Sequence, residues 1–564
     1  MSEWRASPSL EVFTDRVHEL NILAQAAADL ERGRPHHIAL FGLRRIGKTL
    51  LCQEQMRHLA VQGRVIPVYM NLEGICTSPE LFVQRYIGLT CFWAVAGGRG
   101  SVEPYLRPVD LLQTPAATVP VALDAMRFLI TEAGREVVDP GALLHLAFDF
   151  PDRLAIALGR PIMCFLDEFT ELAALAKFPQ AGNPYKLFRS VMQQHAHVGY
   201  VVTGSAITAM EQMVRNHESP LFLQLRAIEL PPLTAEDTQA LTTKIIGRPL
   251  NPAAQAEVYA YTGGHPFYVT ALVERLRELA LDEPEAITQE QIAQAFVLET
   301  LGARGQIYNY CRYLYDISLQ KARGYAALKA LLQILAEEDG LSLTEAARRM
   351  HRGPSSVRDY LRWLIDVDLL VIREQRYFYR DTVLRYWVAY TSRGIETDGF
   401  PNAEDLKRLV ADLSERFARA STQLGRAKES EVRELLRKLA GRTVPGACLG
   451  QNAPIPVPAF TRIEPYRSPD GQTEIDAVAD AVADAVADAV AENGERWAVE
   501  VKWRQKRVGR SELEQLLAAA TTLQARAWCV SQAGFTPDAL TFAAGNDVLI
   551  SNGEDLAALA KLVK

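Results

Sequence analysis

Short runs of apolar residues alternate with longer, helix-like segments through the first half of the chain. Such runs stand at 37–41 (HIALF), 161–166 (PIMCFL) and 197–202 (HVGYVV). A short continuous apolar run is typical of a strand that is buried on both faces, as in a parallel sheet covered by helices. The pattern therefore predicts an α/β core.

Between 324 and 381 the pattern changes to short amphipathic helices followed by a strand pair. Helices are predicted at 325–338 (YAALKALLQILAEE), 342–350 (SLTEAARRM) and within 354–370 (PSSVRDYLRWLIDVDLL), and strands within 369–380 (LLVIREQRYFYR). Ser342 is the expected N-cap of the second helix, and Ser355 or Ser356 that of the third. One face of the third helix is apolar, with Val357, Leu361, Leu364 and Ile365.

This order of elements resembles a winged helix-turn-helix, whose last helix enters the major groove of DNA. The exposed side of that helix offers Ser355, Ser356, Arg358 and Arg362, but Asp359, Asp366 and Asp368 dilute its positive charge. DNA binding is therefore one interpretation. The other is that the winged helix only packs against its neighbours or relays a signal between domains.

Length and composition indicate several ordinary globular domains. With 564 residues, 48% of them hydrophobic and 23% charged, the chain is too long for one hydrophobic core. A net charge of −7 does not mark the whole chain as a nucleic-acid binder, so basic patches have to be sought locally.

The cysteines and the N-terminus bear on localisation. The seven cysteines are scattered and form no C-x-x-C pair, which argues against a zinc ribbon or a disulfide framework and favours a reducing compartment. The start MSEWRASPSLEVF lacks the layout of a signal peptide, and no apolar run approaches the roughly 18 residues of a membrane-spanning helix. We expect a cytoplasmic protein without membrane contact.

The apolar run 37–41 leads directly into GLRRIGKT, residues 42–49, and a helix-like stretch follows. This is the complete phosphate-binding loop G-x-x-x-x-G-K-[ST] in the strand–loop–helix setting that it requires. Its glycines let backbone N–H groups point at phosphates, its lysine supplies charge to the β and γ oxygens, and its threonine can hold Mg²⁺. The residues expected to bind ATP and its metal are Gly42, Arg45, Gly47, Lys48 and Thr49.

Two carboxylates, Asp167 and Glu168, end the run 161–166, as in a Walker B strand. Asp167 is expected to bind Mg²⁺ through its water shell, and Glu168 to orient or deprotonate the attacking water. The third apolar run ends in the small residues 203–205, and Ser205 could sense the γ-phosphate there. The same tip is equally typical of any strand-to-loop turn.

In their order these segments resemble the archaeal-type ATPase family, within the STAND branch of AAA+-like NTPases. The resemblance covers roughly residues 10–300 and includes FTDR (13–16), GLRRIGKT, CFLDEF (164–169), TGS, an arginine before IEL, and GGHP (263–266). It implies a three-layer core with a helical lid. It further implies that Arg16 contacts the nucleotide region, that His265 and Pro266 couple the lid to it, and that Arg226 is a γ-phosphate sensor or finger. A homo-oligomer is also possible.

A second set of chemical residues stands near the C-terminus. The segment NGERWAVEVKWRQ (493–505) alternates as a strand, with Trp497, Val499, Val501 and Trp503 on one face. Glu500 and Lys502 therefore share the other face. Together with a further carboxylate they could hold Mg²⁺ or Mn²⁺, activate a water and stabilise the charge on a cleaved phosphodiester.

These residues resemble the restriction-endonuclease-like, PD-(D/E)xK fold over roughly residues 425–564. The matching positions are Glu431 on a first helix, Ile475 with Asp476, and Glu500 to Lys502. The resemblance implies a metal-dependent nuclease whose metal ligands include Glu431, an aspartate and Glu500. An E-V-K triplet is also common in solvated strands. The nearby basic residues (Lys502, Arg504, Lys506, Arg507 and Arg510) form either a phosphate-binding patch or a solvated loop.

The position of the metal aspartate is ambiguous, because DAVA occurs four times in succession from Asp476. The candidates are Asp476, Asp480, Asp484 and Asp488. Asp476 has the expected isoleucine before it. A hairpin at Asn493–Gly494, however, would place Asp488 opposite Glu500, and on this geometry we prefer Asp488. Alternatively, the repeat forms a helix with aspartates at four-residue spacing.

The predicted domains are a P-loop NTPase core (1–230), a helical lid (231–318), a winged helix-turn-helix (319–395), a helical linker (396–424) and a restriction-endonuclease-like domain (425–564). The Gly- and Pro-rich stretch 97–120 is predicted to leave the core as an excursion. The favoured hypothesis is an ATP-dependent switch that controls a metal-dependent DNA nuclease. The alternatives are a switch whose C-terminal domain only binds, and a slow ATPase that acts as a DNA-binding regulator.

Overall fold

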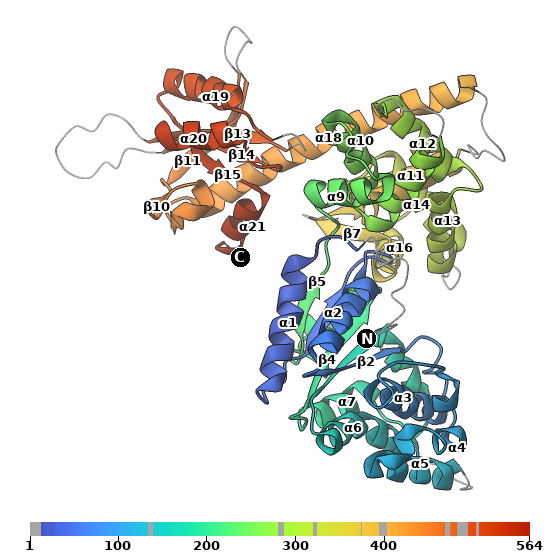
Figure 1. The fold of residues 1–564 in the computed structure, drawn as a ribbon. Coiled ribbons are helices and arrows are strands. Elements are labelled where there is room, and N and C mark those ends of the chain that lie inside the picture. Colours follow the sequence, from blue (N-terminus) through green and yellow to red (C-terminus); the bar gives the residue numbers. More distant parts are fainter. Residues whose placement is uncertain are drawn as a thin grey trace. The chain divides into compact units, whose positions relative to one another are not determined.

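The computed structural model describes residues 13–133, 139–279, 287–319, 324–373, 375–393, 403–467, 474–481, 495–503 and 507–563 (Figure 1). The chain divides into two compact units, Met1–Leu406 and Lys407–Lys564, called unit 1 and unit 2. No helix among the described residues is long and apolar enough to cross a membrane.

A five-stranded parallel sheet forms the centre of unit 1, in the order β2-β3-β4-β1-β5. Because all strands run in one direction, their C-terminal ends meet at one edge, where ligands bind in open α/β sheets. The predicted α/β core is confirmed. The strands are β1 (Ile38–Phe41), β2 (Ile66–Asn71), β3 (Ile162–Asp167), β4 (Val198–Gly204) and β5 (Arg226–Glu229).

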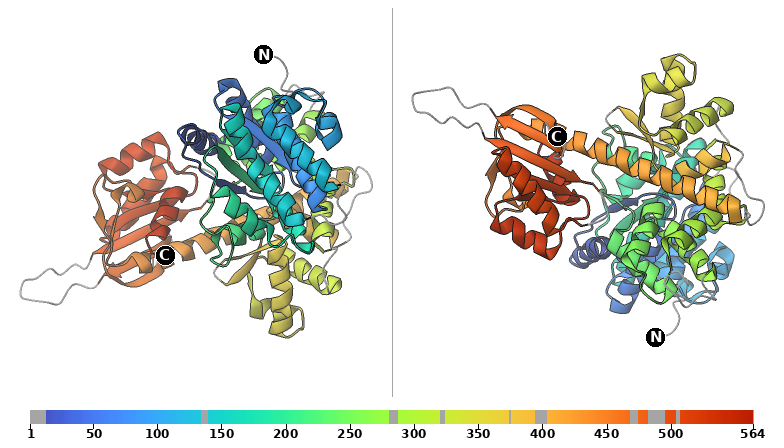
Figure 2. Two further views of the ribbon diagram at one scale, coloured as in Figure 1. Left: turned by 90° about the horizontal axis from the view of Figure 1, so that it is seen from below. Right: turned by 90° about the horizontal axis from the view of Figure 1, so that it is seen from above.

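Helices cover both faces of this sheet and give three layers, which Figure 2 shows from two further directions. Neighbouring residues of a strand point to opposite faces. Ile38 of β1 therefore packs with α1 and α2, while Ala39 packs with α3, α6 and α7 on the other side. These helices are α1 (Val17–Glu31), α2 (Lys48–Gln62), α3 (Pro79–Ala94), α6 (Pro140–Leu158) and α7 (Pro184–Met192).

Between α3 and α6 the chain makes the predicted excursion, which is folded against α3. Gly88 of α3 permits the contact, because a Cβ there would lie 1.8 Å from the carbonyl oxygen of Tyr105. The excursion consists of η2 (Glu103–Tyr105), α4 (Pro108–Leu111), η3 (Pro115–Thr118) and α5 (Pro120–Ala133).

A helical lid follows the sheet. It consists of α9 (Ala235–Ile246), α10 (Pro252–Thr262), α11 (Pro266–Leu279), α12 (Gln289–Leu301) and α13 (Gln306–Leu319).

The next elements have the order expected of a winged helix: α14 (Tyr325–Glu337), β6 (Leu341–Ser342), α15 (Leu343–Arg349), α16 (Pro354–Asp366), β7 (Leu370–Arg373) and β8 (Arg376–Tyr379), then α17 (Thr382–Thr391). Ser342 caps α15 as predicted, since its hydroxyl accepts a hydrogen bond from the Glu345 N–H. The predicted serine cap of α16 is wrong. That helix begins at Pro354 after Gly353, because proline is preset for a first helical turn.

Unit 2 is built on a mixed sheet in the order β11-β12-β13-β14-β15. Its first three strands are antiparallel and its last three parallel. Helices α19 and α20 pack on one face, and α18 and α21 on the other (Figure 1). The strands are β11 (Phe460–Arg467), β12 (Glu474–Ala481), β13 (Arg496–Lys502), β14 (Arg526–Ser531) and β15 (Leu549–Ser551), beside the short pair β9 (Thr443–Val444) and β10 (Ile455–Pro456).

The helices of unit 2 are α18 (Ala403–Leu439), η5 (Gly446–Leu449), α19 (Arg510–Thr522), α20 (Pro537–Gly545) and α21 (Gly553–Lys561). Helix α18 runs without a break through the predicted boundary at 425, so the predicted linker and the first helix of the C-terminal domain are one element. Strand β12 holds the start of the DAVA repeat, so the alternative of a helix is wrong for residues 476–481.

Candidate nucleotide and metal sites

The phosphate-binding loop joins β1 to α2 at the C-terminal edge of the sheet. Gly42 sits where no side chain fits, since a Cβ would lie 2.8 Å from the Leu230 carbonyl oxygen. Gly47 has φ 104, a left-handed conformation that side chains disfavour, and it forms the N-cap of α2. The loop thereby presents a helix N-terminus, with its unpaired N–H groups, to an anion.

Lys48 is almost fully buried and turned onto its own loop, where its ammonium donates to the carbonyl oxygens of Gly42 at 2.9 Å and Leu43 at 3.0 Å. Burial lowers the pKa of Lys48 to about 8, although the charges of Glu168 and Asp167 act in the opposite direction. A buried cation held only by carbonyl oxygens is suited to an anionic ligand.

Three hydroxyl groups converge on Asp167. Thr49 donates to it at 2.8 Å from the phosphate-binding loop, Tyr69 at 2.9 Å from β2, and Thr203 from β4. The carboxylate is thus fixed by groups from three elements beside the loop. Thr49 and Asp167, predicted as metal ligands, are in direct contact. Tyr69 was missed from the sequence, where its only signal is a hydroxyl in the otherwise apolar run IPVYM.

Glu168 follows Asp167 and has φ 51. The Ser205 hydroxyl donates to its carboxylate at 2.8 Å, and the Ser205 N–H donates at 3.3 Å. The tip of β4 and the end of β3 therefore bring together the two residues predicted as γ-phosphate sensor and catalytic carboxylate.

Side chains of the lid contact the two arginines of the phosphate-binding loop. The Arg45 guanidinium lies 4.4 Å from the ring centre of Phe267 in α11 and 4.7 Å from that of Tyr310 in α13. Arg44 donates to the Tyr313 hydroxyl at 2.9 Å. Such cation–π contacts connect the lid to the loop. Arg45, predicted to bind the nucleotide, is held by the lid in this arrangement.

His265 also joins the lid to the loop. Its ring Nε2 lies 3.0 Å from the carbonyl oxygen of Arg44 and must donate, since a carbonyl only accepts. Burial lowers the pKa of His265 to about 3, so the ring is neutral at physiological pH. Arg16 donates to the Ile46 carbonyl at 3.3 Å, so it reaches the loop from the start of α1.

Arg226 stands at the opposite end of the sheet. It pairs in parallel register with Ile38, at the start of β1, whereas the phosphate-binding loop follows Phe41 at the other end. The side chain is exposed. The prediction that Arg226 senses the γ-phosphate of its own chain is therefore wrong, because the parallel register puts this end of β5 away from the loop.

The region from α14 to α17 contacts the core three residues after Ser205. In α8 (Ile207–Arg215), Thr208 donates through its hydroxyl to the Asp368 carboxylate at 2.7 Å and to the Ile365 carbonyl at 3.0 Å. From the lid, Tyr268 donates to the buried Asp381 at the start of α17 at 2.5 Å. Arg358 and Arg362 of α16 remain exposed.

In unit 2, β13 divides its side chains as predicted. Trp497, Val499 and Val501 are buried against α18 and α21, whereas Glu500 and Lys502 lie on the other face and pair with each other. Burial and then the charge of Asp476 raise the pKa of Glu500, and Lys502 counteracts this rise. Two carboxylates held this close favour a bound cation.

The register of β12 brings Asp476 to this site. Ala477 pairs with Val499 in the antiparallel ladder, so Asp476 comes next to Glu500. The Val501 N–H donates to the Asp476 carboxylate at 2.6 Å. The sequence preference for Asp488 assumed a tight hairpin, but β13 pairs with the start of the repeat. Asp488 and Asp484 lie outside the described residues, as do Arg504 and Lys506.

The charge of Glu429 in α18 also raises the pKa of Glu500, as the smallest contribution after burial and Asp476, which raise it, and Lys502, which lowers it. Glu431, the residue predicted, is engaged by Lys428 at 2.5 Å, which in turn stacks on the Trp503 ring. The two glutamates are two residues apart and so point to different sides of a helix, a difference that the short motif could not resolve.

The donor set suits a divalent metal with water ligands. Asp476 and Glu500 supply carboxylate oxygens, the ligands that Mg²⁺ and Mn²⁺ prefer. Among the residues that the structure describes, no group of three or more histidines, cysteines or carboxylates could hold a metal ion.

The C-terminal region matches a known family. Residues 466–560, which include Asp476, Glu500 and Lys502, match the family described as a restriction endonuclease. Unit 2 is similar to restriction endonucleases. This confirms the resemblance read from the sequence in that region. No curated protein matches the chain in sequence.

Solved structures to which this chain is similar include those of three proteins. They are a Walker-type ATPase of Pyrococcus abyssi (12% identity, TM-score 0.45, 67% of this chain and 96% of that chain), the ORC2 protein of Aeropyrum pernix in ADPNP–ADP complexes (14%, 0.43, 70% and 98%) and the RuvB Holliday junction branch migration motor of Thermotoga maritima (14%, 0.33, 68% and 96%). At these TM-scores the P-loop assignment of unit 1 rests on its own sheet and loop.

Proposed function

We propose that the protein binds and hydrolyses ATP in unit 1, and that the nucleotide state controls cleavage of DNA at a divalent-metal site in unit 2. The observation that carries the proposal is the presence of two such sites in one chain. One is a phosphate-binding loop facing Asp167 and Glu168, and the other is Asp476, Glu500 and Lys502 within a restriction-endonuclease match. A cytoplasmic location, where ATP and Mg²⁺ are at hand, belongs to this proposal.

ATP fits the residues of unit 1. The buried Lys48 ammonium has two carbonyl partners that it would exchange for β- and γ-phosphate oxygens, and the N–H groups at the start of α2 would face the same phosphates. Mg²⁺ would be held by Thr49 and Asp167 and would neutralise charge on the phosphates.

Hydrolysis assigns separate roles to the two carboxylates at the C-terminal end of β3. Asp167 is fixed by hydroxyl groups and stays in place, whereas Glu168 is held by Ser205. A change at the tip of β4 would release Glu168 to orient the attacking water. Because Thr208 follows Ser205 and binds Asp368, the same change would reach the winged helix.

In unit 2, Asp476 and Glu500 would hold Mg²⁺ or Mn²⁺, which activates a water for attack on a phosphodiester. Lys502 lies beside Glu500 and would stabilise the charge that develops on the phosphate. Glu429 of α18 would add negative charge near Glu500, whereas Glu431, the glutamate predicted from the sequence, pairs with Lys428.

A DNA-binding role of the winged helix is part of the proposal as well. Arg358 and Arg362 project from one side of α16 into solvent, while Asp368 is occupied by Thr208 and does not dilute that side. Contact of these arginines with DNA phosphates would be salt-dependent.

The test is cleavage of plasmid and single-stranded DNA by the purified full chain with Mg²⁺ or Mn²⁺, with and without ATP. Lys502→Ala is expected to abolish cutting, and Lys48→Ala to abolish the effect of ATP on cutting. If neither DNA is cut or bound under any of these conditions, the proposal is wrong. ATP-dependent DNA binding without cutting would instead support a switch whose C-terminal domain only binds.

A further inference from the structure

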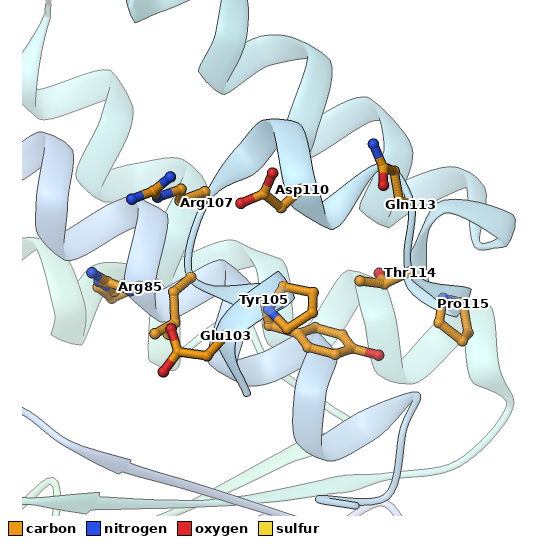
Figure 3. Close-up of a pocket in the computed structure, with 10 residues that line it drawn as sticks. Arg85, Glu103, Tyr105, Arg107, Asp110, Gln113, Thr114 and Pro115 are labelled. Atoms are coloured by element: carbon orange, nitrogen blue, oxygen red, sulfur yellow. The ribbon is translucent and has the colours of Figure 1, made fainter. Parts of the chain in front are cut away.

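The excursion between α3 and α6 borders a partly open hollow that lies within unit 1 and outside the nucleotide site. Its volume is about 740 Å³, which is in the range of pockets for small molecules. Its wall comes from α3, η2, α4 and the start of η3, all in one unit (Figure 3).

The floor of this hollow is pre-formed by close packing. Tyr105 is 5% exposed and packs edge-on against Phe92 with ring centres 5.3 Å apart. Gln84 of α3 donates to the Leu106 carbonyl at 2.5 Å, and Gly88 lets the backbone of Tyr105 approach α3 closely. The excursion therefore offers a fixed surface to a ligand.

Two arginines stand at one end of the hollow. Figure 3 shows Arg85, from α3, and Arg107, from the start of α4, on the same side, with Gln113 and Thr114 at the far side. Neither guanidinium makes a hydrogen bond or ion pair within the described part of the chain, and Nη1 of Arg85 is buried without a partner. Arg85 is half-buried and Arg107 exposed, and a buried guanidinium nitrogen such as Nη1 of Arg85 is normally satisfied by a hydrogen-bond acceptor, for which an oxyanion is well suited.

The other rim residues limit the class of ligand. Glu103 and Asp110 are acidic and, like Gln113, can accept hydrogen bonds from a ligand. A simple anion would leave these groups unused, and a purely cationic ligand would meet two arginines. A ligand with an oxyanion and with N–H or O–H donors would interact both with the two arginines and with the hydrogen-bond acceptors of the hollow.

We propose that this hollow is a binding site for a small molecule that carries a phosphate or carboxylate group, held by Arg85 and Arg107, and hydrogen-bond donors that face Asp110 and Gln113. The two guanidiniums supply bidentate donors in the geometry that both oxyanions accept. The site is separate from the phosphate-binding loop and does not depend on the proposed function.

Calorimetric titration of the full chain tests this proposal, with adenosine 5′-monophosphate as the phosphate probe and citrate as the carboxylate probe. Each is titrated into wild type, Lys48→Ala, Arg107→Gln and Arg99→Gln. Arg99 is an exposed arginine near the excursion that does not line the hollow, so it is the matched control for charge. Arg107 is exposed, so its replacement leaves the fold intact.

We expect saturable binding of one probe that persists in Lys48→Ala and Arg99→Gln and is weakened at least about tenfold in Arg107→Gln, as loss of a charged bidentate donor implies. The probe that binds identifies phosphate or carboxylate as the group. Arg85→Gln, checked for folding by circular dichroism, should weaken it likewise. Binding that disappears in Lys48→Ala, survives Arg107→Gln, or fails for both probes overturns the proposal.

Discussion

Tyr69 donates a hydrogen bond of 2.9 Å to Asp167 from the neighbouring strand. The hydroxyl holds the carboxylate that is proposed to bind Mg²⁺, together with Thr49 and Thr203. Tyr69 would therefore affect the metal ion only by holding Asp167 in place, as residues that hydrogen-bond to metal ligands do.

Tyr69→Phe removes this hydrogen bond and keeps the ring in the core. The Mg²⁺ concentration for half-maximal ATPase activity should rise about tenfold, because outer-shell partners of metal ligands typically contribute that much. Binding of ATP without Mg²⁺ should not change. Tyr185→Phe is the control, since that hydroxyl donates to the Thr170 carbonyl instead. An unchanged Mg²⁺ requirement in Tyr69→Phe would contradict the role.

The stacking of Arg45 on the lid predicts that lid side chains affect ATP affinity. Phe267→Leu removes the ring face and should weaken ATP binding about fivefold, the equivalent of a cation–π contact of about 1 kcal/mol. Phe267→Tyr keeps the face and should bind as wild type. The measurement is the ATP dissociation constant. If Arg45→Ala weakens binding and Phe267→Leu does not, Arg45 contacts the nucleotide directly, as the sequence suggested.

Partial burial of His37 predicts that the stability of the fold falls in acid. Its Nδ1 accepts a hydrogen bond from the Tyr200 N–H, and burial lowers its pKa from 6.5 to about 4. Below about pH 6.5 the unfolded chain binds a proton that the folded chain does not, so the free energy of unfolding falls until about pH 4.

Urea unfolding at pH 7.5 and 4.5 measures this effect. In His37→Asn, which cannot titrate, the loss of stability between the two pH values should be smaller by about 2 kcal/mol than in wild type. His217→Asn, at an exposed imidazole, should lose as much as wild type. Equal losses in all three proteins would show that His37 does not stay neutral in the fold.

The register of β12 predicts which aspartate of the DAVA repeat binds the metal ion of the proposed nuclease site. Asp476→Asn should reduce Mg²⁺-dependent cleavage at least about a hundredfold, as loss of an oriented metal ligand does. Asp480→Asn changes the same residue type on the same strand, opposite Arg496, and should cut nearly as well as wild type. The reverse result would place the metal elsewhere in the repeat.

Features that are formed by consecutive residues could be predicted from the sequence alone. The loop from Gly42 to Thr49 needs a strand before it and a helix after it, and all three are consecutive in the chain. The alternation around Glu500 likewise follows from strand geometry, so the burial of Val499 and Val501 could be predicted.

Other positions depend on how distant segments align, which a single sequence does not show. Arg226 was misplaced because only the parallel register reveals which end of β5 meets the loop. The pairing of Glu431 with Lys428 could not be predicted, because the side of α18 that faces the sheet depends on packing. Tyr69 was missed because a hydroxyl in a core strand is informative only when its acceptor is known.

The period of the DAVA repeat has a consequence for how this gene product can vary. A strand presents the same face every second residue, so a shift of four residues returns each side chain to its original side, whereas a shift of one would invert the face. Gain or loss of one repeat unit would therefore leave an aspartate directly after Ile475, next to Glu500. Such a change would alter the number of residues between β12 and β13 and not the side of β12 that carries this aspartate.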